Sequence, residues 1–578
     1  MTRYVIFLLL MLCGFSGLQA QPSQPTQGQI QELRIVSTTD VHGSFFPIDF
    51  MTGKPASGSM ARVSSYVNRL RHSYGDRLIL LDNGDILQGQ PISYFSNYLD
   101  TLQCNIAGEV VNYLCYDAQN LGNHDIEPGH AVYDKWIGEV DCPTLGANVI
   151  DVATGMPYVK PYVMLNRGGV KVAVLGLLTP AIPHWLAPDV WRGLKFQEMV
   201  LSARYWVDFL RRNEQPDVIV GLFHSGYEGG IVADGYRENA AREVAQQVEG
   251  FDIIFFGHDH TRHNGYEKSP GGKQVLLLNG ANATQAVGDA VVKLEYDGKK
   301  WHIISTEGML TDVTQCDVDE NYMNYFQPFI DKAQRWISQP IGEIAHTITT
   351  RDCFFGNSAF NDLILNLELE ITHADVAFSA PLGTDLKLEK GKITMGDMFS
   401  LYKFENQLYV MNMTGEEIRR HLEMSYGMWC NTMTSASDHL ILMKKDGGKM
   451  QFAGRTYNFD SAAGIDYEVD VTQPVGSRVK ILQMSNGSPF VATQVYKVAM
   501  SSYRANGGGE LLTRGAGIAR DQLASRIVYQ SDLDLRHYLA QAIQRKRLIN
   551  PAPNHNWRFV PEKWTKAAAQ RDYRLLFK

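Results

Sequence analysis

The chain has 578 residues, of which 44% are hydrophobic and 20% charged, and its formal net charge is −8. This balance excludes a disordered chain, a collagen-like repeat and a small disulfide scaffold, and the length fits two large domains or about four average ones. The negative charge argues against a partner that is a nucleic acid polymer, because phosphate backbones require a basic surface.

The first 20 residues have the pattern of an export signal. Arg3 supplies a positive charge, residues 4–13 are apolar, and Ala20 offers a small residue for cleavage before a polar stretch. We expect residues 1–20 to be a signal peptide and the mature protein to be periplasmic, with no membrane span. The alternatives are a membrane anchor and a lipid anchor at Cys13, although Leu12 stands where lipoprotein signals have a small residue.

Residues 30–312 are expected to form an α/β domain. Apolar runs that predict buried strands lie at residues 33–39, 77–82, 170–178, 217–223, 251–257 and 274–280. Amphipathic helical patterns, such as residues 61–71 and 200–212, lie between several of them. Buried strands interleaved with helices indicate a layered α/β fold, whose active site lies beyond the carboxyl ends of the strands.

The remainder of the chain divides into three parts. Residues 313–340 predict a linker helix, interrupted or started near Pro328, and residues 341–534 predict a second domain that opens with a helix over residues 357–371. Residues 535–578 are expected to be a tail that is helical at first. Six cysteines remain after signal removal, and because none forms a CxxC pair, a cysteine zinc site is not expected and disulfide pairing stays open.

Polar side chains cluster where the apolar runs of the first domain end. Five runs are followed in turn by Asp40 and His42, by Asp85, by Asn123, His124, Asp125 and Glu127, by His224, and by His258 and His260. Carboxylate, amide and imidazole groups suit divalent metals such as Mn, Zn, Fe or Co. A single cluster would carry little weight, but five in one domain predict a centre for two divalent metal ions.

In this order, the motifs DxH, GD, GNHD, H and GHxH resemble those of the calcineurin-like metallophosphoesterases. The stretches at residues 38–50, 80–91, 402–429, 457–474 and 502–509 extend the resemblance to the exported nucleotidases, most closely to the bifunctional 2′,3′-cyclic-nucleotide 2′-phosphodiesterase/3′-nucleotidase group. The resemblance implies an N-terminal four-layer α/β/β/α domain and a C-terminal α+β nucleotide-binding domain.

The resemblance also implies roles for individual residues. One metal ion would be held by Asp40, His42, Asp85 and His260, and the other by Asp85, Asn123, His224 and His258, with Asp85 as the bridge. His124 matches the catalytic histidine, which stabilises charge on phosphorus or protonates the leaving oxygen. Its orienting carboxylate is usually an Asp three residues later, where this chain has Glu127; Asp125 is the alternative. Asp49 and Asp259 are expected to be turn residues only.

The second domain is expected to bind the nucleoside part of the substrate. The resemblance places a nucleobase between Phe404 and Tyr503. The glycine run around Gly508 suits close approach of the backbone to a ligand, although such a run is also typical of a flexible turn. Arg351, just before the first helix of the domain, is expected as a further contact. The competing interpretation makes the two aromatic residues ordinary core residues and Arg351 a solvated surface residue.

The expected activity is hydrolysis of 2′,3′-cyclic nucleotides and 3′-nucleotides to nucleosides and phosphate by a monomeric enzyme. A 5′-nucleotidase or UDP-sugar hydrolase is the first alternative, but the Arg of the GGxR motif is missing from residues 379–386, and Gly509 stands where many 5′-nucleotidases have Asp. An inactive nucleotide-binding protein is the alternative of another class. In the family, the second domain can rotate, and residues 321–338 are the expected hinge.

Overall fold

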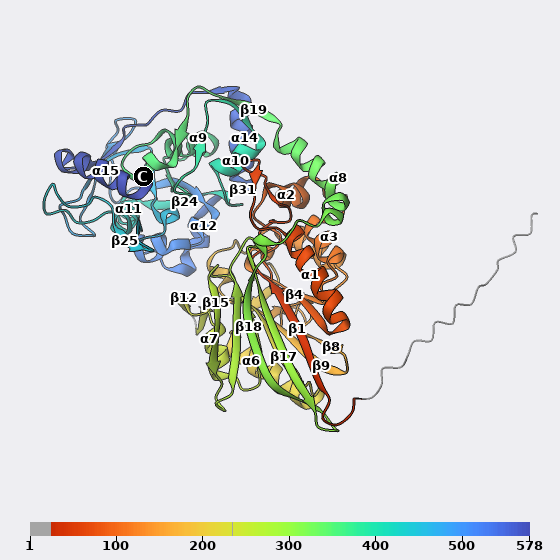
Figure 1. The fold of residues 1–578 in the computed structure, drawn as a ribbon. Coiled ribbons are helices and arrows are strands. Elements are labelled where there is room, and N and C mark those ends of the chain that lie inside the picture. Colours follow the sequence, from red (N-terminus) through yellow and green to blue (C-terminus); the bar gives the residue numbers. More distant parts are fainter. Residues whose placement is uncertain (1–24, 234) are drawn as a thin grey trace, which may run out of the picture.

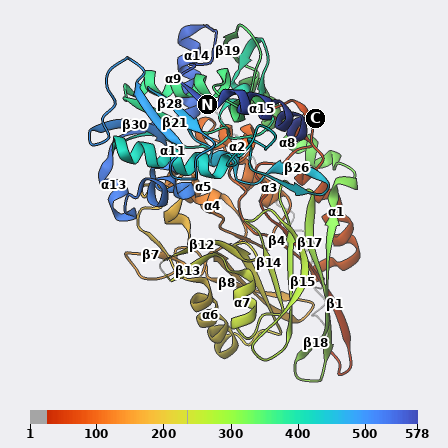
Figure 2. The same ribbon diagram turned by 90° about the vertical axis from the view of Figure 1, so that its left-hand side faces the viewer.

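The computed structural model describes residues 25–233 and 235–578, which form two domains joined by a long helix (Figure 1). The predicted signal peptide and Cys13 lie outside the described residues. Among the helices of the described residues, none is both long and apolar enough to cross a membrane. A 90° turn shows the same division, with the second domain above the first (Figure 2).

The first domain contains two six-stranded sheets packed face to face. In strand order, one sheet comprises β18 (Trp301–Asp312), β17 (Ala286–Tyr296), β1 (Ile30–Thr38), β4 (Leu78–Asp82), β5 (Ala118–Asn120) and β6 (Thr144–Leu145). The other comprises β15 (Arg262–Lys268), β16 (Gln274–Gly280), β14 (Ile253–Phe256), β11 (Val218–His224), β9 (Val170–Leu178) and β8 (Tyr162–Arg167). All six predicted strands are present.

Helices cover the outer face of each sheet. Side chains alternate along β1, so that Leu33 and Ile35 pack between the sheets while Val36 packs under the helices. The helices α1 (Met60–Tyr74), α3 (Ile106–Tyr113) and α5 (His130–Glu139) cover the first sheet, and α6 (Met199–Asn213) and α7 (Ala241–Gln247) cover the second. The predicted four-layer α/β/β/α fold is confirmed.

Parallel pairing brings the carboxyl ends of several strands to one edge. β1, β4, β5 and β6 run parallel in the first sheet, and β9, β11, β14 and β16 run parallel in the second. Figure 1 shows β1 rising from the far end of the domain toward the second domain. The predicted metal ligands therefore follow strands that end beneath the second domain.

The linker helix α8 (Glu320–Ile337) is continuous, so the predicted break near Pro328 is wrong. Asp319 caps its start by accepting hydrogen bonds from the backbone N–H groups of Asn321 and Tyr322. Pro328 lies on the exposed side, where water can satisfy the carbonyl group that loses its helical partner. Burial of Phe326 and Ile330 on the opposite side stabilises the helix across the proline.

The second domain is built on a five-stranded sheet between helices. Its strand order is β27 (Ser461–Ala463), β21 (Val376–Ser379), β30 (Val495–Ser501), β24 (Gln407–Thr414) and β31 (Ile527–Asp534). The helix α9 (Ala359–Thr372) packs on the face that carries Ala377, and α11 (Gly415–Trp429) packs on the face that carries Val376 and Phe378.

The residues expected to form a tail belong to the second domain. The helix α14 (Leu535–Lys546) packs in the same core as α9. β33 (Trp557–Val560) pairs in parallel with β28 (Ile465–Asp470), and α15 (Glu562–Phe577) contributes Ala568 to the core on the α11 face.

The two domains meet at α2 (Pro91–Tyr94) and the short π-helix that follows it (Phe95–Leu99). Tyr94 donates a hydrogen bond from Oη to Oδ2 of Asp534 at 2.5 Å, and Tyr98 donates to Oε2 of Glu405 at 3.0 Å. The guanidinium group of Arg536 lies 5.0 Å from the centre of the Tyr94 ring. At this part of the interface, charged groups of the second domain therefore face tyrosines of the first, and the Tyr94 ring also meets Phe399 edge-on with the centres 5.6 Å apart.

The interface predicts a pH-dependent stability. The half-buried position of Glu405, with the carboxylates of Glu127 and Asp534 nearby, raises its pKa from 4.5 to about 7 although Arg536 opposes the shift. Protonated Glu405 therefore makes its full contribution to the stability of the folded protein below pH 4.5, and this contribution is lost as the pH rises through 7. The free energy of unfolding of the wild type should therefore fall between pH 5 and pH 8. Glu405→Gln cannot ionise, so this fall should be smaller in the variant, by on the order of 2 kcal/mol.

Urea unfolding at both pH values checks this expectation. The exposed Glu343→Gln is the matched control and should keep the wild-type difference. If Glu405→Gln also keeps the full wild-type difference, Glu405 does not titrate at the interface.

Candidate active site

The seven predicted metal ligands lie at one edge of the paired sheets, each close to the end of a strand. Asp40 and His42 follow β1, Asp85 follows β4, Asn123 opens α4 (Asn123–Ile126) just after β5, His224 ends β11, and His258 and His260 follow β14. Strands distant in sequence therefore supply one cluster, as the sequence predicts.

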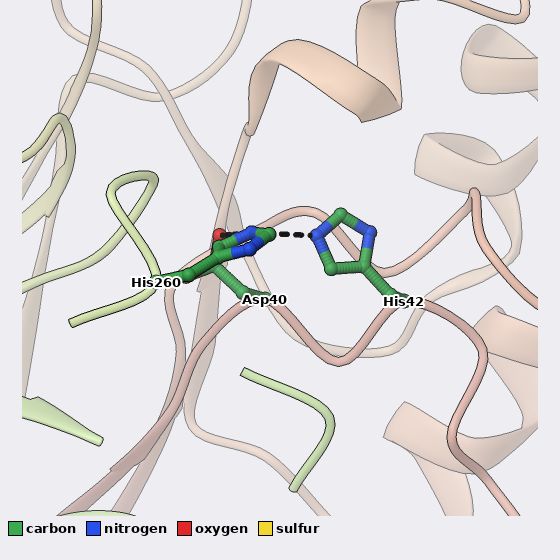
Figure 3. Close-up of side chains that lie close together, drawn as sticks. All are labelled: Asp40, His42 and His260. Carbon is green, nitrogen blue, oxygen red and sulfur yellow. Dashed lines mark hydrogen bonds and ion pairs between the residues drawn. The ribbon is translucent and has the colours of Figure 1, made fainter. Parts of the chain in front are cut away.

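Asp40, His42 and His260 form the first group. Their ligand atoms lie within 4.8 Å of one another, and Figure 3 shows the three side chains pointing to a common centre. Nε2 of His260 lies 3.0 Å from Nε2 of His42 and 3.2 Å from Oδ1 of Asp40 (Figure 3).

Asp85, His224 and His258 form the second group, and Asn123 joins it. Nε2 of His224 lies 3.1 Å from Oδ2 of Asp85 and 3.2 Å from Oδ1 of Asn123. Nδ1 of His258 lies 2.8 Å from the same oxygen of Asn123. Asp85 also lies next to the first group, with its Oδ2 at 3.9 Å from Nε2 of His42, so the position of this carboxylate suits a bridge.

The donor set fits divalent cations. Asp40 is 0% exposed and Asp85 is 1% exposed, and such buried carboxylates require compensating positive charge. Burial, opposed by Asp85, lowers the pKa of His42 to about 4, so this ring is neutral. Burial has the same direction at His224, but the carboxylates of Asp85 and Asp40 outweigh it and raise its pKa to about 10, so a metal ion bound there would displace a proton. Imidazole nitrogens and carboxylate and amide oxygens that converge in this way form the ligand set of a borderline divalent metal.

The backbone around these ligands is held in an unusual conformation. Positive φ angles, between 47° and 72°, occur at Asp40, His42, Asp85, His258 and His260. Non-glycine residues rarely adopt this region, and such strain is concentrated at functional sites. The motif glycines Gly122 and Gly257 explain the tight packing, because a Cβ atom at either would collide with the carboxylate of Asp85 or Asp40, respectively.

Backbone carbonyl groups orient two of the histidines. Nδ1 of His42 lies 3.1 Å from the carbonyl oxygen of Gln88, and Nδ1 of His224 lies 2.7 Å from that of Asn83. A proton held on Nδ1 by these acceptors leaves the Nε2 lone pair directed at the cluster. These contacts could not be predicted from the sequence, because a main-chain acceptor has no residue signature.

His124 lies beside the cluster and contacts Glu127. Its Nδ1 is 2.5 Å from Oε2 of Glu127, and its ring meets that of His42 edge-on with the centres 5.3 Å apart. Burial opposes protonation of His124, but the carboxylates of Asp85 and Glu127 outweigh it and raise its pKa to about 9.

Asp125, the other candidate for orienting His124, has a different set of partners. Its carboxylate accepts hydrogen bonds from the backbone N–H groups of Asp85, Ile86, Leu87 and Gly122. These contacts join the loop after β4 to the loop after β5, so Asp125 shapes the site through the backbone.

The two predicted base-binding residues lie on adjoining segments of the second domain. Phe404 stands between α10 (Met395–Leu401) and β24, and Tyr503 is in α12 (Ser502–Ala505). The backbone N–H of Gln407 donates to Oγ of Ser502 at 3.1 Å, which ties the two segments together. Burial raises the pKa of Tyr503 to about 12, although the guanidinium group of Arg504, 5.5 Å from the centre of its ring, opposes the shift.

Gly508 lies against the Tyr503 ring, whereas Arg351 contacts other residues. A Cβ atom at Gly508 would fall 2.5 Å from the Tyr503 ring, so only glycine lets this loop lie against the ring. Arg351 instead forms a bidentate pair with Asp385 at 2.7 and 2.8 Å and lies over the Phe577 ring. Its described contacts do not include Phe404 or Tyr503.

Two family models match the chain. The calcineurin-like phosphoesterase model matches residues 33–262, and the model of the 5′-nucleotidase C-terminal domain matches residues 340–514. The 2′,3′-cyclic-nucleotide 2′-phosphodiesterase/3′-nucleotidase of Salmonella typhimurium is 24% identical, over 92% of this chain and 89% of that protein.

Two further proteins are similar over most of the chain. The trifunctional nucleotide phosphoesterase YfkN of Bacillus subtilis is 24% identical over 96% of this chain, which spans only 40% of that longer protein. The crystal structure of a 5′-nucleotidase precursor from Thermus thermophilus has the same fold, with a TM-score of 0.64 and 21% identity over 92% of this chain and 100% of that one. The family predicted from the motifs is therefore confirmed: the chain belongs to the 5′-nucleotidase family of phosphoesterases, with a calcineurin-like domain followed by a 5′-nucleotidase C-terminal domain.

Proposed function

We propose that the protein is an exported, periplasmic enzyme that hydrolyses 2′,3′-cyclic nucleotides and 3′-nucleotides to nucleosides and phosphate. The observation that carries the proposal is the convergence of two ligand groups at one sheet edge, with the His124–Glu127 pair beside them. The similarity to the Salmonella protein, which extends over both domains, supports the choice of substrate.

Two divalent metal ions fit the ligand groups. Asp40, His42, Asp85 and His260 would hold one ion, and Asp85 would share the other with Asn123, His224 and His258. When bound, such ions polarise phosphoryl oxygens and make water more acidic. The buried carboxylates of Asp40 and Asp85 supply the negative charge that retains them.

His124 is the proposed proton donor. Glu127 holds the Nδ1 side of the ring, which leaves Nε2 to give its proton to the departing oxygen. With a cyclic substrate, water adds to phosphorus, the bond to the 2′ oxygen breaks and that oxygen takes the proton. A second hydrolysis breaks the bond to the 3′ oxygen and releases the nucleoside and phosphate.

The second domain is proposed to select nucleotides through the faces of Phe404 and Tyr503. Stacking between a base and an aromatic ring tolerates any base, since each base has a polarisable face. Gly508 supports this arrangement by allowing its loop to lie against the Tyr503 ring.

The first experiment compares product release from 2′,3′-cyclic AMP, 3′-AMP and 5′-AMP, with Mn²⁺ and with a chelator. We expect turnover of the first two substrates that is lost with the chelator and restored by metal. A preference for 5′-AMP would favour a 5′-nucleotidase or UDP-sugar hydrolase in place of the proposed activity. Absence of turnover with every metal would leave a nucleotide-binding protein.

Removal of the proposed proton donor should slow catalysis without unfolding the protein. His124→Ala should lower kcat by about 10²–10⁴-fold, the usual contribution of general acid catalysis. His130→Ala is the matched control, because His130 bonds to Asp134 and to the carbonyl group of Arg192. Steady-state kinetics on 3′-AMP at saturating metal measure both variants; equal kcat values would rule out the role of His124.

Removal of either stacking ring should weaken substrate binding. Phe404→Ala and Tyr503→Ala should each raise KM by about 5- to 150-fold, which corresponds to roughly 1–3 kcal/mol of stacking per base. Arg351→Ala should leave KM unchanged, because its guanidinium group is paired with Asp385. A larger effect of Arg351→Ala than of the two aromatic variants would contradict this assignment.

A further inference from the structure

A carboxylate outside the predicted site contacts one of the metal-ligand candidates. Oε1 of Glu238, in β13 (Tyr236–Asn239), lies 3.0 Å from Nε2 of His258. The other ring nitrogen, Nδ1, faces Oδ1 of Asn123 at 2.8 Å. The His258 ring thus has one nitrogen in the second ligand group and the other on a side-chain carboxylate.

This arrangement is the reverse of that at His42 and His224. In those two residues Nδ1 meets a backbone carbonyl group and Nε2 faces the cluster. In His258, Nδ1 faces the cluster and a side chain holds Nε2. A backbone carbonyl group is present whatever the side chain, whereas a carboxylate is lost when its residue is substituted. The orientation of His258 therefore depends on a side chain that a substitution can remove.

Glu238 is itself held at several points. Its Oε2 accepts a hydrogen bond from the backbone N–H of Ile231 at 2.7 Å, across the hairpin formed with β12 (Gly229–Ala233). Its carbonyl oxygen accepts from Oγ1 of Thr179 at 2.9 Å and from Oγ of Ser225 at 2.7 Å. Ser225 follows His224 directly, so the hairpin is anchored to the strand end that carries another ligand.

The ring of His258 is also restrained from its face. The Trp185 ring lies over it, with the centres 5.4 Å apart and the planes inclined by 33°. The side chains of His258 and Glu238 are only 12% and 16% exposed, so water has limited access to their contact. Trp185 therefore restrains the plane of the imidazole, and Glu238 places a hydrogen-bond acceptor at Nε2.

We propose that Glu238 is a positioning residue that keeps the proton of His258 on Nε2 and thereby directs the Nδ1 lone pair to the second metal ion. The inference rests on the proposed function, in which His258 is a metal ligand. A carboxylate in this place fixes the tautomer and increases the basicity of the ligating nitrogen, and loss of such a partner typically lowers metal affinity about 10- to 100-fold.

The test measures metal binding by Glu238→Gln, a variant that keeps the size of the side chain but loses its charge. Mn²⁺ titration of metal-free protein, followed by calorimetry, should show two ions bound by the wild type. In the variant, one of them should bind about 10- to 100-fold more weakly. Glu243→Gln is the matched control, because Glu243 pairs with Arg237 of the same hairpin and should leave both affinities unchanged.

Thermal unfolding separates positioning from a purely structural role. With a positioning role, metal-free Glu238→Gln melts within error of the wild type, and only its stabilisation by Mn²⁺ decreases. Unchanged affinity for both ions would overturn the inference while leaving the proposed function intact. Failure of the wild type to bind any Mn²⁺ would overturn the proposed function, and the role of Glu238 with it.

Discussion

The burial of two carboxylates, Asp40 and Asp85, is the constraint on which the site depends. Neither can remain charged in the interior without cations or hydrogen-bond donors around it. Four histidines converge on them, and the loops that carry the ligands adopt positive φ angles to bring them close. Motif glycines at 122 and 257 leave no Cβ atom between these carboxylates and the neighbouring backbone.

The strained backbone of the ligand loops persists only on a rigid scaffold, and the layered core of the first domain supplies this rigidity. Residues from both sheets interlock between the layers, and the helices bury the outer faces. Each ligand ends or follows a strand whose register is fixed by its neighbours, so the strain is confined to the loops.

Much of the first domain could be predicted because its signals are local. Apolar runs mark the strands, and the polar residues after them mark the edge at which parallel strands end. The break predicted at Pro328 was wrong. Proline interrupts an isolated helix, whereas here burial of the opposite face of α8 stabilises the helix across the proline. The contact of Glu127 with His124 could not be separated from an Asp125 contact by sequence alone. The helical turn of α4 resolves it, since residues three apart share a face.

Other contacts leave no trace in the sequence. Glu238 precedes His258 by 20 positions and reaches it only because a hairpin folds back over the strand end. Arg351 stands where a substrate contact was expected, but its partner Asp385 belongs to a loop whose path no local pattern specifies. Long-range side-chain pairs of this kind depend on the tertiary structure, which composition and periodicity do not determine.

The placement of α8 bears on how the two domains can move. Tyr322, Phe326, Ile330, Ala333 and Ile337 all pack in the core of the first domain, whereas Trp336 meets Phe399 of the second domain edge-on. Because most of α8 is anchored in the first domain, we propose that the expected hinge lies at its end, in the short connection between Ile337 and β19 (Pro340–Ile344). Tyr94–Asp534 and Tyr98–Glu405 are polar contacts that water can replace at modest cost. A rotation at this connection would therefore change the position of the proposed base-binding residues relative to His124, while the metal ligands, which all belong to the first domain, would stay in place.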